Sequence, residues 1–186
     1  MTNPPGRFCD RVKAAEPGVS GTHAPGMNET QQIYAQWLDE LDGATAPAPE
    51  TAGAMAPMLV QDTATRDVVL LSIIDPNMTA EHMADLMDAP YDPVNVDYSA
   101  TAIRHALLSG GREVTDRVRR AAGMLDGCMD TPEYHAVMAY LAWFGRLPSL
   151  GREIDAAGDG GRFSPMLELA QQGRLRGIYP GDMAKA

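Results

Sequence analysis

The chain is short of cysteine and has no long apolar run. Its two cysteines, Cys9 and Cys128, are too few for the disulfide framework of a small secreted domain, so we expect reduced thiols and a cytoplasmic location. Met1 to Met27 has no apolar segment of the kind that a signal peptide needs. The best apolar stretch, Val68 to Ile74, is far shorter than the roughly 20 residues that span a bilayer. We therefore expect no membrane partner.

Aromatic residues and positive charge are scarce as well. Aromatic residues make up 6% of the chain, and 12 methionines supply part of the missing apolar volume. The apolar share of 45% is enough to bury one core, which predicts one domain with a tail. A formal net charge of −10 opposes general binding to nucleic acids, because polyanions bind mainly to lysine and arginine.

Charge is unevenly distributed along the chain. Asp62 to Asp97 contains eight acidic residues and a single basic one, Arg66, whereas Ala100 to Ala122 contains five arginines and two acids. Such a charge dipole can orient a partner or simply keep the protein in solution.

The composition divides the chain into an arm, a domain and a tail. Residues 1–27 are rich in Pro, Gly, Ser and Thr and lack apolar periodicity, which predicts a disordered arm. Residues 28–180 are expected to form a helical domain. An Ala- and Pro-rich linker at 44–60 should interrupt it, with room for one helical turn from Glu50 to Met55, and 181–186 should be a frayed tail.

Apolar residues recurring every three or four positions predict a series of short helices. Asn28 and Gln31 are expected to form a capping box at the start of the first helix, and Gly43 should end that helix. Further helices are expected at 62–74, 79–88, 99–109, 113–125, 131–144, 147–157 and 164–172. The β-branched run in 62–74 also fits a buried strand, but we favour a helix because Asp62 is a good cap and Asp75-Pro76 is a stop.

These elements predict an all-α fold, a compact bundle of seven or eight short helices with antiparallel neighbours. The helix at 131–144 begins with the strong signal Thr131-Pro132-Glu133 and is apolar on nearly all sides. It should therefore be the central helix of the core, with the helix at 147–157 as its antiparallel partner.

Two groups of segments also carry a resemblance to a known family. They are Thr65–Leu71, and Ala136–Gly145 followed by Leu150–Ala157 and Arg176–Pro180. They resemble the helical C-terminal half of an uncharacterised actinobacterial family, a domain of unknown function, over about residues 62–180. The resemblance implies an all-helical bacterial cytoplasmic protein, closed by one helix pair like a tetratricopeptide unit, and it implies no catalytic residues.

The arginines supply the candidate partner-binding residues. Arg66 stands alone among acids, and a helix would point it about 100° away from Asp67. We therefore expect Arg66 to anchor some other carboxylate or to bind an anion. A basic patch follows Ser109-Gly110-Gly111, in the manner of a helix-turn-helix, and could meet phosphates or simply face solvent. The candidate set is Arg66, Arg112, Arg117, Arg119 and Arg120, with Arg104 nearby.

Other reactive residue types give weaker signals. The histidines at 23, 82, 105 and 135 lack the spacing of a helical metal chelate, so we expect no metal and no cofactor. Cys128 could be a nucleophile only with His135 as its base, and acidic neighbours make a packing role the better interpretation. Gly158 to Gly161 lacks the lysine of a phosphate-binding loop and is interpreted as a turn.

Three functions remain open, and no catalytic residue is assigned. The first is a non-enzymatic helical interaction module that binds another protein or a peptide in a groove between helices. The second is a DNA-associated regulator that uses Arg112 to Arg120. The third is an enzyme whose site forms only in the fold, with His82, His105 or His135 beside Asp67 or Glu133. The oligomeric state has no signature in the sequence.

Overall fold

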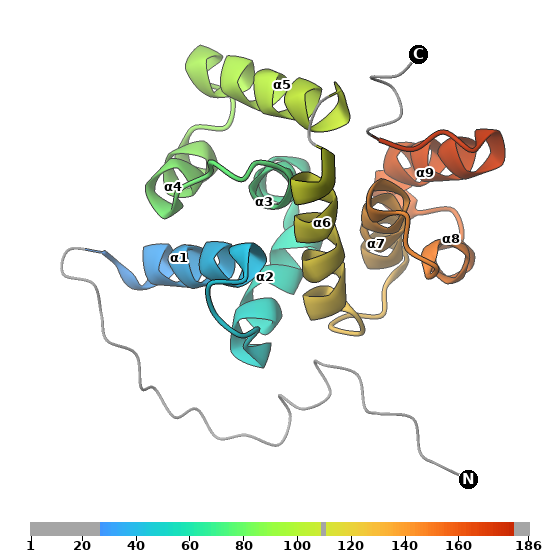
Figure 1. The fold of residues 1–186 in the computed structure, drawn as a ribbon, viewed down its shortest axis with the longest axis horizontal. Coiled ribbons are helices and arrows are strands. Elements are labelled where there is room, and N and C mark those ends of the chain that lie inside the picture. Colours follow the sequence, from blue (N-terminus) through green and yellow to red (C-terminus); the bar gives the residue numbers. More distant parts are fainter. Residues whose placement is uncertain (1–26, 109–110, 181–186) are drawn as a thin grey trace, which may run out of the picture.

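The computed structural model describes residues 27–108 and 111–180, and over these residues the protein is an all-α bundle without strands. These residues form nine α-helices and one short 3-10 helix, and the α-helices are labelled in Figure 1. In chain order they are α1 (Glu29–Asp42), α2 (Pro49–Gln61), α3 (Thr63–Ile74), α4 (Ala80–Asp88), α5 (Pro93–Leu108), α6 (Gly111–Leu125), α7 (Pro132–Gly145), α8 (Leu150–Ala157), η2 (Gly161–Phe163) and α9 (Ser164–Arg176). Residues 1–26 of the predicted arm at 1–27, and the predicted tail at 181–186, lie outside the described residues.

Local capping signals place most helix starts where the sequence predicts them. Asn28 and Gln31 form the expected reciprocal capping box, and Gly43 ends α1 in the left-handed conformation. The side chains of Asp62, Thr79 and Thr131 each accept a backbone N–H three residues further on. The preference for a helix over a strand at 62–74 is therefore confirmed.

The predicted linker at 44–60 is wrong over most of its length. From Pro49 onward it belongs to α2 (Pro49–Gln61), with Pro49 at the first helical position. The helix buries Ala52, Met55 and Leu59 and packs on α3. The sequence of this segment predicts a linker because alanine contributes little to an apolar periodicity. In the structure, its small side chains allow α2 and α3 to approach closely.

α5 and α9 are longer than the helices predicted there. α5 begins at Pro93 rather than at Ser99, because the Asp92 side chain accepts the backbone N–H of Val94 and turns the chain into the helix. α9 continues through Gly173 to Arg176. Gly173 is a packing residue, since a Cβ atom there would lie 2.0 Å from the indole Nε1 of Trp143.

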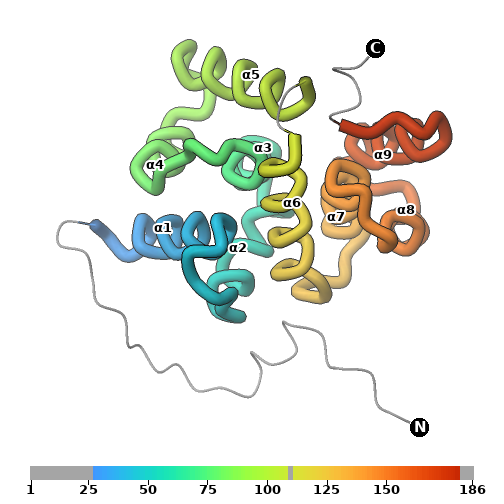
Figure 2. Tube along the Cα trace, viewed as in Figure 1, coloured from blue at the N-terminus to red at the C-terminus, as the bar shows by residue number. Residues whose placement is uncertain are grey.

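The bundle is organised around α6 and α7. Figure 2 shows α6 in the middle, with α1 to α5 on one side and α7 to α9 on the other. α6 packs on α3 and α7, while α7 packs on α8 and α9. α7 buries ten of its fourteen residues, so it is the central helix that the sequence predicts. Among the described residues, no helix combines the length and the apolar content needed to cross a bilayer.

Candidate functional site

Three of the four arginines of α6 contact the C-terminal ends of other helices. The last carbonyls of a helix lack partners within it, and a cation is favoured near them. Arg117 donates to the carbonyls of Ser72 and Ile73 at the end of α3, and it forms an ion pair with Asp42. Burial, and next to it the charge of Arg120, lowers the pKa of Arg117 to about 10, so it is charged at neutral pH.

Arg119 and Arg120 do the same for two further helices. Arg119 donates to the carbonyl of Gly145, at the end of α7, over 3.0 Å. Arg120 donates to the carbonyl of Leu41, near the end of α1. The prediction that these arginines form a solvent-exposed face is therefore wrong for Arg117, which is buried, and only partly right for the other two. Arg112 is exposed, and its Nε atom lies 3.5 Å from a carboxylate oxygen of Asp116.

Arg66 lies under the surface and pairs with the residue next to it. Its Nε and Nη2 atoms donate to Asp67 over 2.8 and 2.6 Å. The expectation that these two side chains cannot pair is wrong, because an arginine is long enough to bend around the helix to its neighbour. The guanidinium also lies 4.5 Å from the ring centre of Phe163. Arg66 is therefore buried while the side chain of Asp67 remains 57% exposed.

Beside this ion pair lies a large apolar groove. It has a volume of about 520 Å³ and is lined mainly by three helices, α3, α5 and α9. Leu70, Leu71 and Ile74 of α3 form part of its lining, and Tyr140 of α7 reaches it as well. Burial, assisted by the charge of Asp67, raises the pKa of Tyr140 to about 12, so its hydroxyl remains protonated.

The two remaining walls carry exposed apolar side chains. Val96 and Ile103 of α5 line the groove and are 50% and 43% exposed. Leu169 of α9 and Tyr91, in the loop before α5, line it too and are exposed. Exposed apolar side chains that gather around a cavity are typical of a site that receives another apolar surface.

One wall of the groove, α5, is held by few contacts. Of its sixteen residues, only Ala106 is buried. The hydroxyl of Tyr98 donates to the carboxylate of Asp75, just beyond the end of α3. The Tyr98 ring lies 4.0 Å from the ring of His82 on α4. Burial, with further contributions from Asp75, raises the pKa of Tyr98, so this hydroxyl remains a donor.

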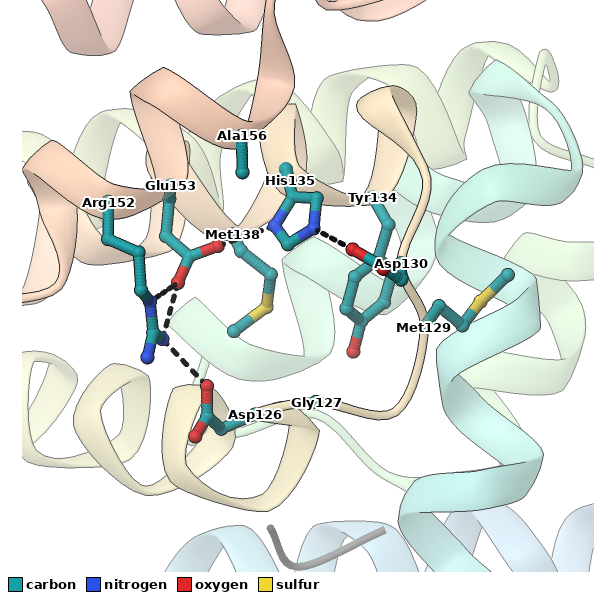
Figure 3. Close-up of a pocket in the computed structure, with 10 residues that line it drawn as sticks. All are labelled: Asp126, Gly127, Met129, Asp130, Tyr134, His135, Met138, Arg152, Glu153 and Ala156. Atoms are coloured by element: carbon teal, nitrogen blue, oxygen red, sulfur yellow. Dashed lines mark hydrogen bonds and ion pairs between the residues drawn. The ribbon is translucent and has the colours of Figure 1, made fainter. Parts of the chain in front are cut away.

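A second, smaller cavity of about 160 Å³ lies beside His135 (Figure 3). The imidazole stands between two carboxylates, with Nδ1 2.8 Å from Glu153 of α8 and Nε2 2.9 Å from Asp130 of the preceding loop. Arg152 extends the cluster by contacting Glu153 and, over 2.7 Å, Asp126. Figure 3 shows these five side chains as a continuous polar chain that joins α8 to the loop between α6 and α7.

The geometry of this cluster favours a charged histidine. Burial alone would lower the pKa of His135, but the hydrogen bonds and charges of Asp130 and Glu153 outweigh it and raise the pKa. A carboxylate only accepts hydrogen bonds, so both ring nitrogens must donate. A general base needs a free nitrogen lone pair, and an imidazole that donates from both nitrogens has none. The cluster is therefore arranged to hold α7, α8 and the α6–α7 loop together.

The other predicted reactive residues do not assemble into a reactive centre. His105 is exposed on α5, and within the described residues no three histidine, cysteine or acidic side chains could together hold a metal ion. His23 lies outside the described residues. Cys128 packs against the core, and its Sγ lies 3.6 Å from the carbonyl of Met124. Gly158 to Gly160 form the predicted turn after α8, and Gly161 begins η2.

The groove, the polar cluster at His135 and the contact between Tyr98 and Asp75 were not predicted from the sequence. The cluster at His135 needs the packing of α8 on α7, and the contact between Tyr98 and Asp75 joins residues 23 positions apart. One signal for the groove was present. Val96 and Ile103 are seven residues apart, on one face of a helix that also has polar positions.

Comparisons with family models, with curated proteins and with solved structures give no match to this chain.

Proposed function

We propose that this protein is a helical interaction module that binds an apolar segment of a partner protein in the groove between α3, α5 and α9. The observation that carries the proposal is the exposed apolar lining of a groove of about 520 Å³. Leaving Tyr91, Val96, Ile103 and Leu169 in water is unfavourable by about 25 cal/mol for each Å² of apolar surface. Covering them supplies the driving force for binding.

The shape of the groove supports a helical segment as the bound element. Its walls are themselves helices, which present apolar side chains at helical spacing: Val96 and Ile103 on α5, Met166 and Leu169 on α9. A third helix that enters between them would pack its own apolar stripe against both walls, which is a common mode of peptide recognition. The adaptable side chain of Met166 suits such a surface.

A binding selection tests the proposal directly. Helical peptides enriched from a displayed random library should bind the full chain, and Ile103→Glu should weaken that binding at least tenfold. The matched control is Val94→Glu, because Val94 is on the same helix, is 75% exposed and does not line the groove. We expect less than a twofold change in that variant. The proposal is refuted if the selection enriches no peptide, or if Ile103→Glu and Val94→Glu weaken peptide binding equally.

The DNA-associated alternative has less support. Arg117, Arg119 and Arg120 are engaged with the C-termini of three helices, which leaves Arg112 as the fully exposed arginine of the predicted patch. The exposed cations of this region, Arg104, Arg112 and Arg119, are few for a chain of net charge −10 and supply little counterion release.

A further inference from the structure

The elements that form one side of the groove present carboxylates to solvent. From Asp62 to Asp97, which includes α3, α4 and the first part of α5, six acidic side chains are exposed. The one arginine of this segment, Arg66, is buried and paired with Asp67. The exposed charges are therefore all negative: Asp67, Glu81, Asp85, Asp88, Asp92 and Asp97.

Asp67 brings this charge into the groove itself. It lines the groove together with Arg66, and its side chain is 57% exposed whereas that of Arg66 is 11% exposed. An arriving segment therefore meets the carboxylate first. The charge of Asp67 also contributes, after burial, to the raised pKa of Tyr140, which lines the groove as well.

We propose that the bound segment is a cationic amphipathic helix, whose apolar stripe fills the groove and whose lysines or arginines face Asp67 and the exposed carboxylates of α4 and the first part of α5. This inference rests on the proposed function and specifies the partner. Complementary charge adds specificity and speeds encounter, while the apolar contacts supply most of the affinity. A second copy of this chain fits less well, because the same acidic surface and the net charge of −10 would repel it.

Three synthetic peptides separate the charge from the apolar contact. They share one apolar stripe, with residues at helical spacing, and carry lysine, glutamine or glutamate on the polar face. We expect the lysine peptide to bind the full chain at least tenfold more tightly than the glutamate peptide in fluorescence anisotropy. The gap should narrow as salt rises from about 50 mM to about 500 mM, because salt screens exposed charges.

Substitutions in the protein locate the charge. Asp67→Asn should weaken binding of the lysine peptide several-fold and leave the glutamine peptide unchanged. Because that change also removes the partner of Arg66, Asp97→Lys serves as an independent variant with the same expected direction. The matched control is Asp155→Lys, at an exposed position of α8, a helix that contributes no residue to the groove, whereas Asp97 follows the groove residue Val96; the control should have less than a twofold effect.

The outcomes distinguish this inference from the proposed function. If all three peptides bind equally and Ile103→Glu abolishes binding of each, the groove is a binding site but the preference for cationic helices is wrong. If none of the peptides binds, both proposals fail. Tighter binding of the glutamate peptide would likewise overturn the inference.

Discussion

At the residue scale, His135 is the side chain whose charge state determines the most contacts. It joins α7 to α8 through Glu153, which is buried, and to the α6–α7 loop through Asp130, which is exposed. The other charged groups of the cluster are Arg152 and Asp126. Loss of the proton removes one of the two donors, so one carboxylate loses its hydrogen bond.

This arrangement predicts a stability that falls with rising pH. The pKa of His135 is higher in the folded protein than in the unfolded chain, so folding favours the protonated form. The stabilisation is fully present below the unfolded pKa of about 6.5 and disappears as the pH rises through the higher, folded pKa. Urea unfolding between about pH 5.5 and pH 8.5 should show this decrease in the free energy of unfolding.

His135→Gln should remove most of that pH dependence, whereas His105→Gln, on the exposed side of α5, should retain it. A pH profile of the His135 variant that is parallel to that of the original protein would show that other groups are responsible. From sequence, His135 was one of three equal candidates. Its actual neighbours could not be predicted, since Glu153 reaches it only through the packing of α8 on α7.

At the element scale, α6 acts as a hub that combines an apolar stripe with three capping arginines. The stripe of Val114, Val118, Ala121 and Leu125 was predictable from spacing and is buried as expected. The role of the arginines was not predictable, because the carbonyls that they contact belong to helices 26 to 79 residues away. A pattern of charge beside a stripe describes a solvent-exposed face and a capping face equally well.

Arg117 is the arginine whose loss should cost the most stability. Arg117→Ala leaves the carbonyls of Ser72 and Ile73 without their donor, so we expect a loss of about 3 kcal/mol in the free energy of unfolding. Arg117→Met fills the same space and should lose nearly as much, since the carbonyls remain unpaired. Arg112→Ala, on the same helix but exposed, should change stability by less than about 0.5 kcal/mol. Equal effects at the two positions would contradict the capping role.

At the scale of the whole molecule, the sequence predicted the class of fold better than it predicted the surface. Caps such as Asn28 and Thr131 are local signals, so helix starts followed from a few residues. α2 was missed because its small side chains contribute little periodicity, and its burial depends on α3. The groove was missed because it exists only where α3, α5 and α9 come together.

The bundle should accordingly open in parts rather than all at once. α5 buries one of its sixteen residues and α7 buries ten of its fourteen, so less free energy is needed to expose the amides of α5. Hydrogen exchange should therefore be faster throughout α5 than in α7.

Tyr98→Phe, which removes the hydroxyl that contacts Asp75, should accelerate exchange in α5 and leave α7 unchanged. A helical peptide in the groove should slow exchange in α5 first, because that wall gains the most new contacts. If α5 instead exchanges only when the whole protein unfolds, it is an integral part of the core and cannot adjust to a bound segment.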